Sequence, residues 1–209
     1  SLALLGAVSV AGNVELTSGS HVVLGGETAV GGDLWLAGQG QPEGSLSTVS
    51  AGATLTVGGE ARIEVEAGGL VQSGAFTVQG DLLADLRSFT TESGSVTTLG
   101  GTQNLLFSRG SVSIEGDVVP TEDAARDTTS SQRGKLFAFV NLDRREPSSG
   151  VTVGATFHGA LLSPFSPVTL GTGARVTGAV IASRLSVQGN ARLRQDRGLA
   201  SVELGVSSA

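Results

Sequence analysis

The side chains that could carry acid–base or nucleophilic chemistry are few and widely separated in this sequence. It contains no cysteine, and its two histidines are His21 and His158. No G-x-S-x-G sequence is present, so no serine is expected on the sharp turn that exposes the nucleophile of many hydrolases. Nucleophilic catalysis needs a serine or cysteine aligned with a base and an orienting acid. We therefore predict that the chain has no catalytic residues and is not an enzyme.

One charged group comes closest to a catalytic cluster: Asp81, Asp85 and Arg87. Acidic and basic side chains of this kind line the grooves of solenoid enzymes that cleave polysaccharides. Charged residues along one strand are explained more simply as a solvated surface, because such residues are seldom fully buried. We favour the solvated surface.

Five glycine pairs could be mistaken for phosphate-binding loops. None precedes a Lys-Ser or Lys-Thr sequence or opens a predicted helix, which a phosphate cradle would require. No EF-hand loop and no nine-residue calcium repeat occurs either. We therefore expect no cofactor and no metal ion. We interpret the pairs as corners of the chain: Gly25-Gly26, Gly31-Gly32, Gly58-Gly59, Gly68-Gly69 and Gly100-Gly101.

Three carboxylates, Asp33, Glu60 and Asp81, follow glycines at similar positions. If these segments stack in register, the three side chains lie about 4.8 Å apart. Like charges at that distance repel one another unless a cation or an arginine lies between them. Two interpretations stay open: the carboxylates share a cation, or they point outward into water. We favour the second.

Positive charge is concentrated in the second half of the sequence. Residues 1–105 carry two arginines and ten carboxylates, a net charge of −8, whereas residues 106–209 carry a net charge of +2. Arg192 and Arg194 alternate along a predicted strand and therefore share a face. Such a strip could bind a phosphate backbone, an acidic glycan or a neighbouring subunit, or it could simply protect an open end of the fold. The candidate residues are Arg175, Arg184, Arg192, Arg194 and Arg197.

The composition favours one folded domain. Glycine occupies 32 of the 209 positions without a strict three-residue period, which excludes collagen. An apolar fraction of 39% excludes a disordered linker. No run of 18 apolar residues is present, so we expect this segment not to insert into a membrane. The sequence begins at Ser1 without a methionine, and we interpret it as a processed product or an excised fragment.

A short unit recurs along the chain: Val or Ile, any residue, Gly, usually a polar residue, then an apolar residue. Alternating apolar residues before the glycine predict a short strand with one buried face. The glycine then takes a crowded or positive-φ position at a corner, which the adjacent Asn or Asp also favours. The first four glycines are separated by 20, 27 and 21 residues, which we interpret as one coil, and the last two by 11, half a coil or one face. The predicted corners are Gly12, Gly32, Gly59, Gly80, Gly116, Gly178 and Gly189.

Short strands at this spacing predict a single-stranded parallel β-solenoid rather than a sandwich with long hairpins. We expect one all-β domain over residues 1–209, with roughly eight to ten coils and very little helix. Residues 39–47 and 119–150 interrupt the repeat with prolines or charges. Within the longer interruption, Leu136–Val140 predicts a buried strand, and the segments around it are expected to protrude from the stack.

The last quarter of the sequence contains an ordered string of repeat units. It includes Phe157-His-Gly-Ala-Leu-Leu-Ser-Pro164, Ala174-Arg-Val-Thr-Gly178-Ala-Val-Ile-Ala182 and Leu185-Ser-Val-Gln-Gly189-Asn-Ala-Arg-Leu193. This string resembles the C-terminal signature of bacterial β-solenoid domains in PilX-like pilus assembly proteins and choice-of-anchor A proteins. The resemblance implies an extracellular or cell-surface domain, sometimes carried by a large minor pilin of a type IV pilus.

We therefore expect a non-enzymatic structural or adhesive module that displays a binding face on a rigid solenoid. Its expected partners are other pilus or surface subunits, with a glycan, a surface or DNA as further candidates. One alternative is a polymer-forming scaffold, because bactofilins have a similar V-x-G-polar repeat. Another is a DNA-binding or ice-binding solenoid, since Thr172–Ala182 is similar to a stretch of bacterial ice-binding proteins. Ice binding needs regular threonine ranks, which are not evident from the sequence.

Overall fold

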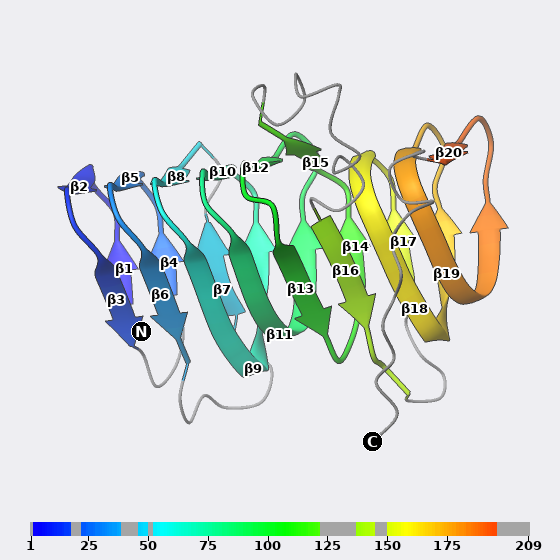
Figure 1. Ribbon diagram of the computed structural model, residues 1–209, viewed down its shortest axis with the longest axis horizontal. Helices are drawn as coiled ribbons and strands as arrows, with labels where there is room; N and C mark the ends of the chain where they lie inside the picture. The colour runs from blue at the N-terminus through cyan, green and yellow to red at the C-terminus, as the bar shows by residue number, and fades with distance from the viewer. Residues whose placement is uncertain are drawn as a thin grey trace.

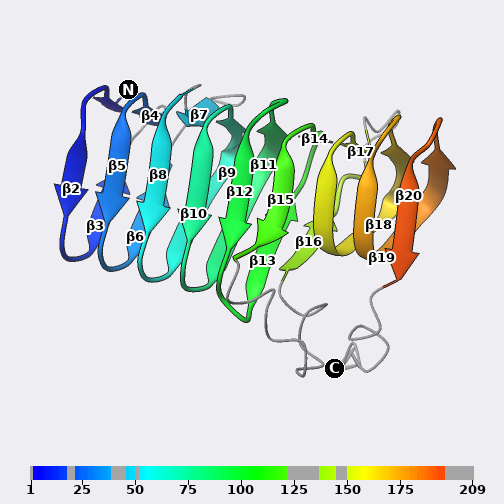
Figure 2. The same ribbon diagram turned by 90° about the horizontal axis from the view of Figure 1, so that it is seen from above.

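The computed structural model describes residues 2–17, 22–38, 46–49, 52–121, 137–144 and 150–195. Every regular element in these residues is a β-strand, and the strands pair in parallel. The first strand pairs with the fourth, the second with the fifth and the third with the sixth. The chain therefore winds as a coil with three faces. Figures 1 and 2 show the coils stacked along the long axis, from β1–β3 at one end to β19 and β20 at the other. The predicted parallel β-solenoid is confirmed.

Each face is one ladder of parallel strands, and we name the faces A, B and C in chain order. Face A contains β1 (Leu2–Leu4), β4 (Val22–Leu24), β7 (Leu46–Val49), the ends of β9 (Ala61–Gln72) and β11 (Leu82–Thr91), β14 (Val112–Ile114), β17 (Val151–Val153) and the ends of β18 (Thr156–Leu170) and β19 (Arg175–Val187). Face B contains β2 (Val8–Val10), β5 (Glu27–Val30), β8 (Thr54–Val57), β10 (Ala75–Val78), β12 (Val96–Leu99), β15 (Asp117–Pro120), the starts of β18 and β19, and β20 (Arg192–Gln195). Face C contains β3 (Val14–Thr17), β6 (Leu34–Ala37), the starts of β9 and β11, β13 (Asn104–Ser108), β16 (Phe137–Asn141) and the middle parts of β18 and β19.

The core runs through the interior of the stack as one cluster of inward-facing side chains. Alternate residues of each short strand point inward, so the burial pattern follows the two-residue period of a strand. Phe139 and Phe157 are fully buried. Both pack against Phe137, with ring centroids 6.4 Å and 5.5 Å away, and Phe139 also lies 6.2 Å from Phe89. The strand predicted at residues 136–140 is therefore confirmed over residues 137–140, which belong to β16, while residue 136 lies outside the described residues.

The predicted corner glycines do not all occupy one corner. Gly12, Gly32, Gly59, Gly80 and Gly178 lie where face B turns into face C, whereas Gly116 and Gly189 lie where face A turns into face B. The spacing of 11 residues between Gly178 and Gly189 therefore joins two different corners. This interval, interpreted from the sequence as half a coil or one face, covers faces C and A.

Crowding, rather than backbone conformation, explains most of these glycines. Of the seven, only Gly178 and Gly189 have positive φ, at 152° and 52°. A β-carbon at Gly80 would lie 2.5 Å from the carbonyl oxygen of Gly59, one coil away, which is far inside van der Waals contact. Gly12 is different, because a β-carbon there would meet no other atom within 4 Å. Within one copy of the chain, Gly12 is not a corner that requires glycine.

Most of the two predicted interruptions lies outside the described residues. In the interruption predicted at residues 39–47, residues 39–45 are not described. In the one predicted at residues 119–150, residues 122–136 and 145–149 are not described. The described chain leaves face B at the end of β15 and resumes in β16 on face C. An insertion between two faces therefore leaves the register of the stack intact on both sides.

Candidate functional site

The structure brings together three of the five predicted arginines. Arg175 and Arg192 are direct partners on β19 and β20, and Arg194 is paired with Thr177, two residues further along. All three are exposed on the outer side of face B. Arg184 is paired with Pro167 on face A instead, so it does not join them. Arg197 lies outside the described residues.

The corner carboxylates bond to the backbone of the next coil. Oδ1 of Asp33 accepts a hydrogen bond from the backbone N–H of Glu60 at 2.8 Å. Oδ1 of Asp81 accepts two, from the N–H groups of Thr102 at 2.8 Å and Gln103 at 2.9 Å. A carboxylate that faces amide N–H groups has its charge stabilised by charge-assisted hydrogen bonds. Asp33 and Glu60 are exposed, as the favoured interpretation expects, whereas the hydrogen bonds from Asp33 and Asp81 to the next coil were not predicted.

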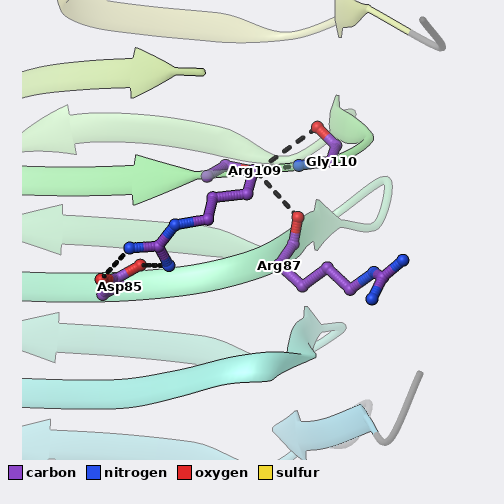
Figure 3. Close-up of polar contacts among 5 residues, drawn as sticks. Asp85, Arg87, Arg109 and Gly110 are labelled. Carbon is purple, nitrogen blue, oxygen red and sulfur yellow. Dashed lines mark hydrogen bonds and ion pairs between the residues drawn. The ribbon is translucent and has the colours of Figure 1, made fainter. Parts of the chain in front are cut away.

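The charged group at Asp81, Asp85 and Arg87 does not converge on one point. Asp85 forms a two-pronged ion pair with Arg109 of the next coil, in which Nη1 bonds Oδ1 and Nη2 lies 2.8 Å from Oδ2. Figure 3 shows Arg109 reaching across to Asp85, while the Arg87 side chain points away from the pair. The ion pair ties neighbouring strands of face C together. Among the described residues, no three His, Cys, Asp or Glu side chains form a group that could hold a metal ion.

The outer surface of face C carries apolar side chains in two rows, which we call the apolar face. In the register of the ladder, Leu83 is paired with Leu105 and Phe107 with Val140, and both rows continue onto β18 and β19. These residues alternate with buried core residues, so their side chains point outward. They are partly exposed, and Ile181 at the end of one row is 50% exposed. The apolar face consists of Leu83, Leu105, Phe107, Ala138, Val140, Ala160, Leu162, Ala179 and Ile181.

The apolar face leaves one signal in the sequence. The strands of face C are apolar at consecutive positions, as in Leu105-Leu106-Phe107 and Ala160-Leu161-Leu162. A strand with one face in water normally alternates apolar and polar residues, whereas a strand covered on both faces is apolar throughout. Strands β8 and β10 on face B, in contrast, place threonines outward. The apolar runs of β13, β16 and β18 therefore follow the pattern of strands that are covered on both faces.

The outer row that holds Leu83 continues toward the N-terminus with polar and aromatic residues. Leu83 is paired with Arg62, Arg62 with Trp35, and Trp35 with Glu15. The Arg62 guanidinium lies 5.9 Å from the centre of the Trp35 ring, and Trp35 is 38% exposed. A shallow open groove of about 470 Å³ lies beside this part of the face. Face C therefore changes along its length from a polar surface with one exposed tryptophan to the apolar face.

Face B presents one regular rank of threonines. Thr56, Thr77 and Thr98 are direct partners on successive strands and point outward. The neighbouring outward row is mixed, because Thr54 is followed by Ala75 and then by Val96. This rank was not predicted, although its three members recur at intervals of 21 residues in the sequence. On face B, one rank of three does not form the flat array of several ranks that ice binding requires. A second outward row of hydroxyl side chains lies on face A and consists of Thr90, Ser113, Thr152, Thr169 and Ser186.

Within the described residues, no helix is long and apolar enough to cross a membrane. No family model, no curated protein and no solved structure matches this chain.

Proposed function

We propose that the chain is a non-enzymatic structural and adhesive module of a bacterial cell surface or pilus, and that it binds another surface subunit through the apolar face. The observation that carries this proposal is the pair of outward apolar rows on face C. Extended apolar patches on monomeric proteins mark interaction sites, because leaving them in water forfeits the free energy of burial.

The geometry of the solenoid suits a binding platform. The apolar rows lie on parallel strands that are hydrogen-bonded on both sides, except in the middle part of β19, which is paired with β18 alone among the described residues. The side chains are therefore held at fixed spacings before a partner arrives. A surface that is already ordered loses little conformational entropy on binding. Trp35, at the polar end of face C, adds a residue type that is enriched among energetically dominant contacts.

The cell-surface and pilus context comes from the resemblance of residues 157–193 to surface solenoid domains. Within that stretch the structure describes strands β18 and β19, which supply the last part of the apolar face. Another pilus or surface subunit with a complementary apolar surface is therefore the partner that this proposal names.

The test is to replace Leu105, Leu162 and Ile181 by glutamine in the bacterium that encodes the chain. Immunoblots then follow the protein in three fractions: the sheared surface fraction, the culture medium and the cell interior. We expect the wild-type chain in the sheared surface fraction and the triple variant in the medium, because the variant loses its apolar contact with the surface subunit.

A matched variant carries glutamine at Thr56, Thr77 and Thr98, the outward rank of face B, and should stay on the surface. Circular dichroism of the purified proteins checks that both variants keep the strand content of the wild type. Finding the wild-type chain inside the cell would contradict the surface placement. Retention of the face C variant at the wild-type level would contradict binding through the apolar face.

A further inference from the structure

The shallow groove beside face C lies near its corner with face B. The residues that line it come from three successive coils, at β3, β6 and the start of β9, which Figure 1 shows side by side. Neighbouring parallel strands are about 4.8 Å apart, so these residues span about 10 Å along the stack. The groove has a volume of about 470 Å³, within the range of about 300–1,000 Å³ that is common for small-molecule sites.

One row of polar side chains borders the groove at the corner. It consists of Asn13, Asp33 and Glu60, which each precede a strand of face C and are exposed. Oδ1 of Asn13 accepts the backbone N–H of Asp33 at 2.9 Å, and Oδ1 of Asp33 accepts that of Glu60 at 2.8 Å. The first two side chains are therefore held in place by the backbone of the next coil before any ligand arrives.

A second row lies two residues further along each strand and contains the tryptophan. Trp35 is directly paired with Glu15 in the coil before it and with Arg62 in the coil after it. The Arg62 guanidinium lies 5.9 Å from the centre of the Trp35 ring, and its Nε donates to Oε1 of Glu64 at 2.7 Å. Trp35 is 38% exposed. The groove therefore combines one aromatic surface with two ordered rows of polar groups.

The charges in the groove disfavour both kinds of ion. The carboxylates of Glu15, Asp33 and Glu60 would repel a phosphate, an acidic glycan or a nucleic acid. A cationic ligand would be attracted to the same carboxylates, but the position over the Trp35 ring is already occupied by the Arg62 guanidinium. A neutral ligand meets neither obstacle.

The hydrogen-bonding groups suit a ligand that is rich in hydroxyl groups. The carboxylates accept hydrogen bonds, whereas the side chains of Asn13, Trp35 and Arg62 carry N–H groups that donate them. A hydroxyl group both donates and accepts, so neighbouring hydroxyls on a sugar ring can bond to both kinds of group. The C–H groups of the same ring form an apolar patch that can pack on the indole, which has an apolar body and a polar N–H.

We propose that this groove binds a neutral saccharide, with the apolar patch of one sugar ring packed on Trp35 and its hydroxyl groups bonded to the carboxylates of Asp33 and Glu60. The apolar face begins at Leu83, one coil beyond Arg62 in the same outward row. Saccharide binding in the groove therefore does not depend on binding of a surface subunit to the apolar face.

The test uses the fluorescence of Trp35, which is the only tryptophan in a chain without tyrosine and therefore reports on this groove alone. The purified chain is titrated with neutral trisaccharides of glucose, galactose, mannose, xylose and N-acetylglucosamine. We expect at least one of them to shift the emission to shorter wavelength, because the sugar ring removes water from the indole. The dissociation constant should be in the millimolar range and equal at low and physiological salt, since a neutral ligand has no charge to screen.

Two variants are measured by ligand-observed NMR with the trisaccharide that binds. Trp35→Leu should weaken binding about tenfold or more, because the aromatic contact is lost. Glu60→Ala should weaken it about tenfold, the usual effect of losing a hydrogen bond to a charged group. Glu27→Ala is the matched control, because it removes the same kind of charge from face B of a neighbouring coil and should bind like the wild type. Circular dichroism checks that each variant keeps its strand content.

An unchanged spectrum with all five trisaccharides overturns the proposal, as does wild-type binding by Trp35→Leu. Equal affinities of Glu60→Ala and Glu27→Ala would also overturn it. A titration with trilysine tests the cationic alternative, and a salt-sensitive shift with trilysine alone would replace the saccharide by a basic ligand. The variant with glutamine at Leu105, Leu162 and Ile181 should bind the trisaccharide like the wild type, which separates this groove from the apolar face.

Discussion

The Asp33 carboxylate bonds to the backbone N–H of Glu60, with 2.8 Å between Oδ1 and N, although the two residues are 27 positions apart in the sequence. The coil before has the same contact, in which Asn13 Oδ1 accepts the N–H of Asp33 at 2.9 Å. A similar bond between coils, at another corner, joins Asp117 Oδ1 to the N–H of Thr156 at 2.8 Å. The short polar residue of the repeat therefore stabilises the next corner in the stack rather than its own.

This relationship predicts that Asp33→Ala lowers the free energy of unfolding by about 1 kcal/mol, the usual net contribution of one hydrogen bond. Asp33→Asn is the control and should cost less, because an amide oxygen serves as the acceptor at Asn13. Urea denaturation followed by circular dichroism measures both variants. Equal losses for the two would show that the negative charge, rather than the acceptor, stabilises this corner.

The corner glycines predict a contrast between two positions of the same repeat. Gly80→Ala should destabilise the fold by about 1–3 kcal/mol, because its β-carbon would press against the carbonyl group of Gly59. Gly12→Ala should be neutral or slightly stabilising, since alanine restricts the unfolded chain and meets no neighbour. Both values come from urea denaturation at a concentration where the protein is monomeric. A loss at Gly12 as large as that at Gly80 would mean that crowding between coils does not explain the repeat.

The parallel solenoid could be predicted from the sequence because its main determinants are local. Alternation in segments such as Val112-Ser113-Ile114 fixes which side chains point inward, and recurring glycines mark where the chain turns. The assignment of glycines to corners could not be predicted in the same way. A unit such as Val187–Ala191 has the same pattern at either corner, and only the strand pairing distinguishes the two.

The candidate sites depend even more on pairing between coils. Arg175 and Arg192 are direct partners, whereas Arg184 lies on another face, although all three belong to one basic stretch of sequence. The ion pair between Asp85 and Arg109 also joins two coils, and its register follows from strand lengths that the sequence specifies only approximately. The apolar runs of face C were visible in the sequence, but their meaning required knowing which residues point outward.

The aromatic cluster predicts where the stack is most sensitive to the loss of volume. Phe139 is fully buried and lies between Phe89 and Phe137. Phe139→Ala should lower the free energy of unfolding by about 3–5 kcal/mol, because it removes buried apolar surface and leaves a cavity. Phe139→Leu fills most of that volume and should cost considerably less. Thermal and urea denaturation of both variants give the comparison, and a loss below about 1 kcal/mol for Phe139→Ala would contradict tight packing at this point.

The arginines at the end of face B lead to a prediction about polyanions. The chain carries a net charge of −6, so any binding of DNA is expected to be weak and confined to low salt. Arg175, Arg192 and Arg194 are neighbours on one face, so replacing all three by glutamine should flatten the slope of log affinity against log salt by roughly three units if each contacts a phosphate. Arg184→Gln is the matched control, because it removes the same kind of charge from face A and should leave most of the slope intact. Fluorescence anisotropy of a labelled duplex, titrated from low to physiological salt, measures the slopes.

Binding that survives the triple change with the same slope would place the contact elsewhere on the chain. No binding by the wild type even at low salt would leave these arginines with the role of carrying charge at the end of the stack.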